Sequence, residues 1–146
     1  MLTSPPQRAI GAKRYNSPEY WNQQWRDRPV ARPSALVIQS LLNLVKMRTP
    51  APTSIVEIGG GTAPVLDILH SFVPEAECIG FDISEEAQQA NRERFPWARW
   101  YSGDATTGIG FSDNLAGFVY SSHLIEHLED PWALLEEQMR ICQPGG

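Results

Sequence analysis

The stretch SIVEIGGGTAP, residues 54–64, combines a carboxylate with three consecutive glycines at the end of an apolar run. Glycines let a backbone approach a bound ligand closely, and a turn of this kind after a parallel strand is a common ligand site. Glu57 lies two residues before Gly59. Its charge repels a pyrophosphate and attracts an ammonium or sulfonium group. The turn therefore favours a cationic ligand.

The same turn departs from the fingerprint of a dinucleotide site, which is G-x-G-x-x-G. Counting from Gly59 places Pro64 where the third glycine belongs. Together with the acid at Glu57, this mismatch points to S-adenosylmethionine, which carries both an ammonium and a sulfonium group, rather than to a nicotinamide dinucleotide.

A second acid follows at a spacing that suits a nucleoside. Asp82 lies near the end of the apolar stretch ECIGFDI, twenty-one residues after Gly61. A carboxylate at the end of a second strand can accept hydrogen bonds from both hydroxyls of a ribose. This residue predicts an adenosine-bearing ligand, but alone it does not separate one such cofactor from another.

Three residues near the end of the chain, His123, Glu126 and His127, spell H-x-x-E-H. On a long helix this spacing is the inverted zinc-protease signature. Here it follows an apolar strand and precedes Asp130 and Pro131, which are typical of the start of a new helix. We therefore expect no metal. His127 is a candidate general base for a substrate hydroxyl, or a brace of the loop, and His70 is expected to be structural.

From residue 53 onwards, short apolar runs alternate with helical patterns. The expected strands cover residues 54–58, 77–83, 98–102 and 115–122, and the expected helices cover 64–73, 84–95 and 131–142. Strands separated by helices imply parallel pairing with right-handed crossovers. The predicted fold is α/β, a doubly wound Rossmann-like open parallel sheet with helices on both faces.

The charges divide the chain in two. Residues 1–50 carry eight Lys and Arg against two acids, a balance of 8 − 2 = +6, and the remainder carries 4 − 15 = −11. We expect a basic N-terminal arm over 1–50 and a cofactor-binding domain over 51–146. Because the arginines are scattered singly among prolines and aromatic residues, the arm is expected to pack on its own acidic domain and not on nucleic acid.

Two helices are expected within the arm, over residues 17–28 and 34–48. The first has Ser17 as its cap and carries three aromatic residues near one face: Tyr20, Trp21 and Trp25. The second carries an apolar stripe of Val37, Leu41, Leu44 and Val45. The aromatic residues are either a lid over the substrate face or plain core.

The length and composition limit which other classes of protein this chain can belong to. A chain of 146 residues with 42% hydrophobic residues makes one domain with a core. It has no apolar run of membrane-spanning length, and its first fifteen residues lack the apolar centre of a signal peptide, so we expect a cytoplasmic protein without membrane contact. Cys78 and Cys142 are expected to be reduced, buried thiols.

The turn QPGG at 143–146 ought to lead into a further strand, so we expect the front part of a longer protein. We also expect this part to self-associate through its open sheet edge.

Two stretches resemble a known family over about residues 53–146. VEIGGGTAP resembles motif I of class I S-adenosylmethionine-dependent methyltransferases, written E/D-x-G-x-G-x-G, with Ala63 at the third glycine. FVYSSHLIEHLEDP resembles the fourth strand and loop of the methyltransferase type 11 group. The resemblance implies S-adenosyl-L-methionine as cofactor, a small-molecule methyl acceptor, and a sheet of seven strands of which this chain holds the first four.

The resemblance also implies roles for individual residues. Glu57 would lie near the methionine amino group, Asp104 near the adenine amino group, and Ser122 beneath the methionine end. The cofactor-binding residues expected in this way are Glu57, Gly59, Gly60, Gly61, Asp82, Ile83, Asp104, Ala105, Ser122 and His123.

Other interpretations remain open. A nicotinamide-dependent oxidoreductase is disfavoured by Glu57 and Pro64. A truncated or non-catalytic domain that binds cofactor or a partner without turnover is the alternative outside enzymes. The loop also resembles that of quinone-pathway O-methyltransferases, where E-x-x-E-H binds a divalent ion, with His123 replacing the first acid.

Overall fold

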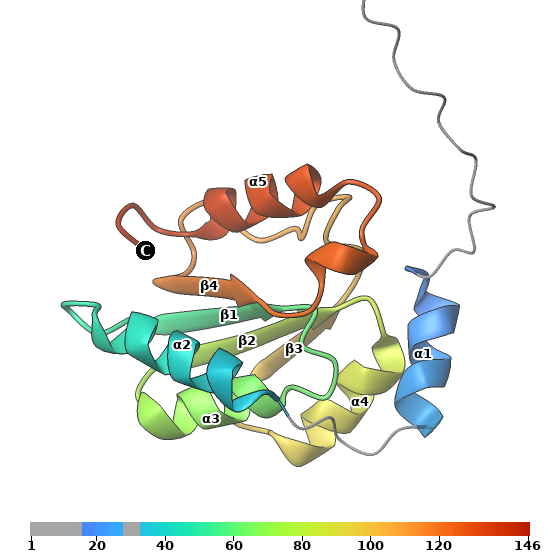
Figure 1. Ribbon diagram of the computed structural model, residues 1–146, viewed down its shortest axis with the longest axis horizontal. Helices are drawn as coiled ribbons and strands as arrows, with labels where there is room; N and C mark the ends of the chain where they lie inside the picture. The colour runs from blue at the N-terminus through green and yellow to red at the C-terminus, as the bar shows by residue number, and fades with distance from the viewer. Residues whose placement is uncertain (1–15, 28–32) are drawn as a thin grey trace, which may run out of the picture.

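Four strands pair in parallel and form one sheet in the order β3-β2-β1-β4 (Figure 1). The computed structural model describes residues 16–27 and 33–146. The strands are β1 (Ser54–Ile58), β2 (Glu77–Asp82), β3 (Arg99–Ser102) and β4 (Phe118–Ser121). This confirms the predicted open parallel sheet, with β1 at its centre between β2 and β4.

Helices cover both faces of the sheet, as predicted. One face carries α2 (Ala35–Lys46), α3 (Pro64–Phe72) and α4 (Glu85–Arg94), and the other carries α5 (Pro131–Ile141) (Figure 1). The remaining helix, α1 (Pro18–Asp27), lies beyond the carboxyl ends of the strands and contacts α4. The first fifteen residues and residues 28–32 of the expected arm lie outside the described residues.

Short polar side chains begin α1, α4 and α5, because their oxygens accept hydrogen bonds from backbone N–H groups that the helix itself leaves unpaired. Ser17 accepts from Tyr20 N at 3.2 Å, and Ser84 accepts from Ala87 N at the same distance. Asp130 accepts from the first turn of α5 at 3.0 Å. The predicted caps at Ser17 and Asp130 are therefore confirmed.

The strands alternate their side chains between two apolar clusters, one on each face of the sheet. The largest fully buried side chains on the side of α3 are Ile55, Leu66 and Leu69, and those on the side of α5 are Ile58, Leu134 and Ile141. In α2, Val45 is buried but Leu44 is 51% exposed. Leu44 was wrongly placed in the apolar stripe, because Leu41 and Leu42 form the contact with the core instead.

The outer edge of β4 is partly covered. Ala116, just before β4, accepts a hydrogen bond from Gln143 N and donates one to Ile141 O, both at 2.9 Å, so the chain after α5 runs parallel beside it. Both cysteines are free thiols, with Cys78 buried and Cys142 half-buried. None of the helices in the described ranges is long and apolar enough to cross a membrane.

Gly80 in β2 provides a sensitive test of this packing. An ideal Cβ at Gly80 would overlap the ring of Trp100, which is buried and fixed by a 3.0 Å hydrogen bond from its Nε1 to Phe95 O. We expect Gly80→Ala to lower the free energy of unfolding by about 1–3 kcal/mol, the usual cost of overpacking.

Urea unfolding measures this change, and Gly117→Ala is the matched control. Gly117 is also buried, but a Cβ there would meet its nearest neighbours at 3.4 Å, an ordinary contact. Equal stabilities of the two variants would show that the Trp100 ring does not lie across Gly80.

Candidate functional site

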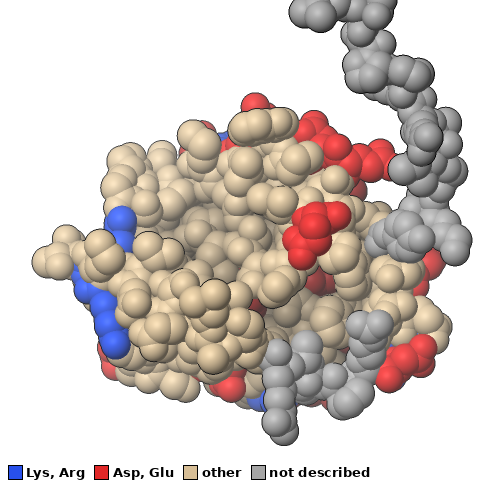
Figure 2. Space-filling view, in the orientation of Figure 1, with Lys and Arg blue, Asp and Glu red and all other residues tan. Residues whose placement is uncertain are grey.

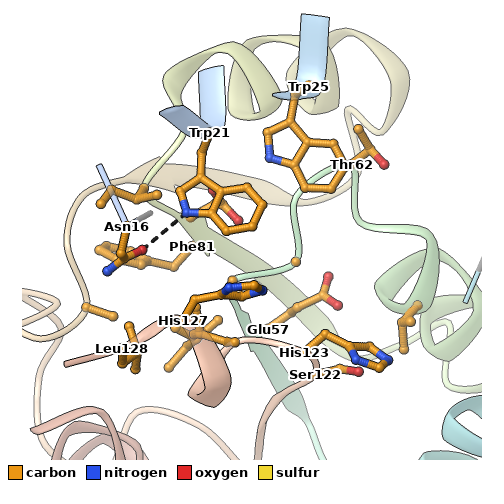
Figure 3. A pocket seen from close by; sticks show the side chains of 18 of the residues that line it. Asn16, Trp21, Trp25, Glu57, Thr62, Phe81, Ser122, His123, His127 and Leu128 are labelled. Carbon is orange, nitrogen blue, oxygen red and sulfur yellow. Dashed lines mark hydrogen bonds between the residues drawn. The ribbon is translucent and has the colours of Figure 1, made fainter. Parts of the chain in front are cut away.

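The carboxyl ends of the strands open into one cavity of about 250 Å³. Its walls come from the glycine turn after β1, the segments after β2, β3 and β4, and the aromatic side chains of α1. Figure 3 shows the two tryptophans of α1 on one side of this cavity. Glu57 and the loop that carries His123 and His127, called the histidine loop below, face them from the other side. In an open α/β sheet this is the expected place for a ligand.

The glycine turn takes a conformation that needs small residues. Gly59 and Gly61 have φ of +73° and +54°, in the left-handed region that glycine enters without strain. A Cβ at Gly60 would overlap the Glu57 carboxyl group directly beneath it. Ala63, at the family's third glycine, keeps the left-handed conformation with φ of +51°. This departure from the family pattern leaves the turn intact.

Asp82 ties the turn to the next helix. Its Oδ2 accepts from Gly61 N and its Oδ1 from Ser84 N, both at 2.8 Å, and Asn91 Nδ2 donates to Gly61 O at 2.7 Å. Burial raises the pKa of Asp82, and these backbone N–H groups oppose the rise. Asp82 lines the cavity as expected, but in this structure both of its oxygens already hold the loop, so its contact with a ribose stays a prediction.

Glu57 is a buried acid at the end of the central strand, with 2% of its surface exposed. Loss of hydration raises its pKa from 4.5 to about 8, and the nearby Asp82 adds to this rise. The Tyr120 hydroxyl opposes the rise, yet within the described ranges Tyr120 Oη and Glu57 Oε2 are both buried without a hydrogen bond of normal geometry. Glu57 is therefore largely protonated near neutral pH when no cation is beside it.

Helix α1 is fastened to the first turn of α4. Asn22 Oδ1 accepts from Ser84 Oγ at 2.7 Å and from Glu86 N at 3.3 Å, and Arg26 forms an ion pair with Glu86. The ion pair is exposed, so its contribution to stability is small. This part of the basic arm packs on its own acidic domain, as expected. In Figure 2, Asp and Glu side chains lie mainly on the side of the molecule where α1 is found, and Lys and Arg lie mainly near the end of α2.

The aromatic side chains of α1 cover the cavity. An ideal Cβ at Gly61 would overlap the Trp25 ring, so this indole lies directly on the glycine turn. Trp21 packs against Trp25 with ring centroids 6.2 Å apart, and it meets the His127 ring edge-on at 5.0 Å. Trp21 Nε1 donates to Asn16 Oδ1 at 3.2 Å (Figure 3). Of the two roles open for these residues, the position of both tryptophans favours the lid.

The histidine loop does not form the helix that a zinc protease needs. Glu126 and His127 lie in one 3₁₀ turn, Ile125–His127, and His123 precedes it in the left-handed region with φ of +56°. His123 Nδ1 lies 3.5 Å from Glu126 Oε1. Over residues 16–27 and 33–146, no three His, Cys, Asp or Glu side chains are grouped as metal ligands are. His70 stacks on Trp97 with centroids 3.9 Å apart, away from the cavity.

The remaining predicted residues fall around the same cavity. Asp104 accepts from Thr106 N and Thr106 Oγ1 at 2.9 and 2.7 Å, so it caps its turn while it lines the cavity. Gly61 alone among the predicted cofactor residues is not part of the lining, because Trp25 covers it. The predicted residues that line the cavity are Glu57, Gly59, Gly60, Asp82, Ile83, Asp104, Ala105, Ser122, His123 and His127.

Sequence reasoning missed Thr62, Asn22 and Asn91. Thr62 adjoins the glycines and lines the cavity, so its place beside the motif was a usable signal. Asn91 fixes the turn through a hydrogen bond over 30 residues of sequence, and Asn22 fixes α1 through hydrogen bonds over 62 and 64 residues. Nothing in the local pattern marks them.

Residues 56–146 match the model of a family described as a methyltransferase domain. The chain is similar to the ubiquinone/menaquinone biosynthesis C-methyltransferase UbiE of Desulfotalea psychrophila, with 26% identity over 105 residues. It is also similar to the malonyl-[acyl-carrier protein] O-methyltransferase of Methylococcus capsulatus, with 27% identity over 111 residues. These matches cover 70% and 74% of this chain but only 42% and 40% of the relatives.

Among solved structures, the chain is similar in fold to an S-adenosylmethionine-dependent methyltransferase from Aquifex aeolicus. The two share 18% sequence identity at a TM-score of 0.67, over 84% of this chain and 68% of that one. This likeness supports the Rossmann-like arrangement of the sheet and helices.

The raised pKa of Glu57 predicts how stability depends on pH. Between about pH 4.5 and 8 the folded protein keeps a proton that the unfolded chain releases, so stability falls as pH rises across this window. The steepest decline is roughly 1 kcal/mol per pH unit. Glu57→Gln removes the titration, so we expect this variant to be the more stable protein at pH 8 and the pH dependence to be shallower.

Urea unfolding between pH 5 and pH 8 measures both slopes. Glu75→Gln, at an exposed position in the turn before β2, is the control and should keep the slope of the unaltered protein. Parallel curves for the unaltered protein and Glu57→Gln would contradict the raised pKa.

Proposed function

The chain belongs to the methyltransferase domain family of class I S-adenosylmethionine-dependent enzymes, and we propose that it binds S-adenosyl-L-methionine and transfers its methyl group to a small-molecule acceptor. The single observation that carries the proposal is Glu57. A buried carboxyl group without a full set of partners faces the cavity from beneath the glycine turn. An ammonium group beside it favours the ionised carboxylate and lowers the cost of its burial.

The rest of the cavity fits the same cofactor. Gly59 and Gly60 line the cavity, and a side chain at either position would collide with Leu124 or Glu57, so the turn there requires glycine. Asp82 and Asp104 lie after the second and third strands, where carboxylates can meet a ribose and an adenine. Ser122 and His123 form the opposite wall below the tryptophans.

The bound cofactor supplies an electrophilic methyl carbon on a sulfonium, and the acceptor's nucleophile attacks it in line. The protein mainly aligns the reactants and excludes water. The Trp21 and Trp25 side chains suit this task, because they close the cavity on the side of α1. We assign His127 as the base that takes the proton from the acceptor, since its ring lines the cavity and Trp21 fixes its position.

The acceptor atom is not assigned. The names of the two curated relatives specify transfer to carbon in one and to oxygen in the other, at nearly the same identity to this chain. The chain spans about two fifths of those relatives, so the activity is proposed for the whole protein. A cofactor-binding domain without turnover is the alternative. We propose no contact with nucleic acid or membrane, and self-association through the exposed part of β4.

Calorimetric titration tests the cofactor. We expect saturable binding of S-adenosyl-L-methionine and no binding of NADH, because Pro64 begins α3 where a dinucleotide site has its third glycine. Glu57→Gln should weaken the affinity at least about tenfold, since the charge that meets the ammonium is lost. Glu75→Gln should bind like the unaltered protein, and binding of NADH alone would refute the proposal.

The role of His127 as a base is tested by a substitution that removes the imidazole nitrogens and keeps an aromatic ring at this position. We expect His127→Phe to retain cofactor affinity, because a phenyl ring can keep the edge-on contact with Trp21. Methyl transfer to a hydroxyl acceptor found by screening should fall roughly 10²–10⁴-fold, the usual share of a general base. His127→Ala should lose the contact as well. Full activity of His127→Phe would leave His127 only the role of a brace.

A further inference from the structure

The outer face of α5 carries large apolar side chains that are exposed to water. Trp132 is 71% exposed and Met139 is 77% exposed. Met139 lies two helical turns after Trp132, so both point away from the buried Leu134 and Ile141. Glu136 is also exposed and lies between them on the same side of the helix. We call Trp132, Glu136 and Met139 the α5 face.

The outer side of α2 has a similar row of apolar side chains with a charge of the opposite sign. Leu36 is 76% exposed, Leu44 51% and Met47, at the end of the helix, 78%. Leu44 and Met47 lie about two and three turns after Leu36, on one side of the helix. Lys46 is exposed beside them, with its Nζ 5.2 Å from the centre of the Phe72 ring. We call Leu36, Leu44, Lys46 and Met47 the α2 face.

These two faces complement each other in chemistry. Single exposed apolar residues are common on proteins, but apolar patches rimmed by polar residues mark interaction sites. The α5 face has a carboxylate among its apolar side chains, and the α2 face has an ammonium group. We propose that the α5 face of one molecule binds the α2 face of a second molecule, with Glu136 placed against Lys46. Apolar burial then supplies affinity, and the charge pair sets the orientation.

The positions of the two helices determine the kind of assembly. Helices α2 and α5 cover opposite faces of the sheet, so the two faces cannot meet within one molecule (Figure 1). Each molecule therefore offers one face to each of two neighbours, and the contact repeats head to tail. No residue of either face lies in β4, so this contact is separate from pairing through that strand. It also does not depend on the proposed cofactor.

Sedimentation velocity of the full chain at low salt tests the contact. The unaltered protein should show a sedimentation coefficient that rises with concentration. Lys46→Glu places two acids opposite each other, and Glu136→Lys places two cations there. We expect each variant alone to associate at least about tenfold more weakly, because like charges oppose the contact. An equimolar mixture of the two should regain association, since every contact between unlike variants again joins opposite charges.

Glu93→Lys is the matched control, because it makes the same change of charge at an exposed position of α4 and should associate like the unaltered protein. Trp132→Ser should also weaken association, through loss of apolar contact. An unaltered protein that stays monomeric at every concentration would overturn the inference. So would single variants that associate normally, or a mixture that stays dissociated, because another surface would then hold the molecules together.

Discussion

The burial of one carboxyl group at the end of the central strand is the constraint on which the site depends. Glu57 has strands on both sides, Gly80 and Tyr120 as its partners in register, and Gly60 above it. Burying an acid costs free energy unless it is paired or protonated. The apolar clusters on the two faces of the sheet hold the acid in place despite that cost, and so the fold keeps a group ready for a cation.

A second set of contacts fixes the segments that form the cavity around this acid. Asp82 accepts backbone N–H groups from the glycine turn and from the start of α4, so the two segments are fixed relative to each other. Ser84, next along the chain, caps α4 and also donates to Asn22 of α1. A short series of hydrogen bonds therefore runs from the glycine turn through α4 to the helix that covers the site.

Much of this arrangement follows from local pattern. The alternation of apolar runs and helical segments predicted the parallel sheet, because the two inner strands β1 and β2 are nearly wholly buried and helices follow them in the sequence. The glycine turn and its acid predicted where a ligand binds, since that geometry depends on residues close in sequence. The predicted cavity residues lie after four different strands, and parallel pairing alone brings such positions together.

What the sequence could not predict depends on contacts across long separations. Asp82 holds the loop with both oxygens, and Asn22 reaches Ser84. Trp21 Nε1 has a hydrogen-bond acceptor, whereas Trp25 Nε1 has none among residues 16–27 and 33–146. All of these contacts follow from tertiary packing. Leu44 was misplaced for a related reason. A helix with apolar residues on more than one side does not reveal which of them meets the sheet until its neighbours are known.

The place of α1 bears on how this protein can be divided. The family match begins at residue 56, in the middle of β1, whereas the roof of the cavity comes from residues 16–25. A fragment cut at that boundary would keep the glycine turn, the acid and most of the strands. It would lose the indoles that shield them from water, and also α2 with its buried Val45. The unit that forms the cavity is thus larger than the range that the family model matches.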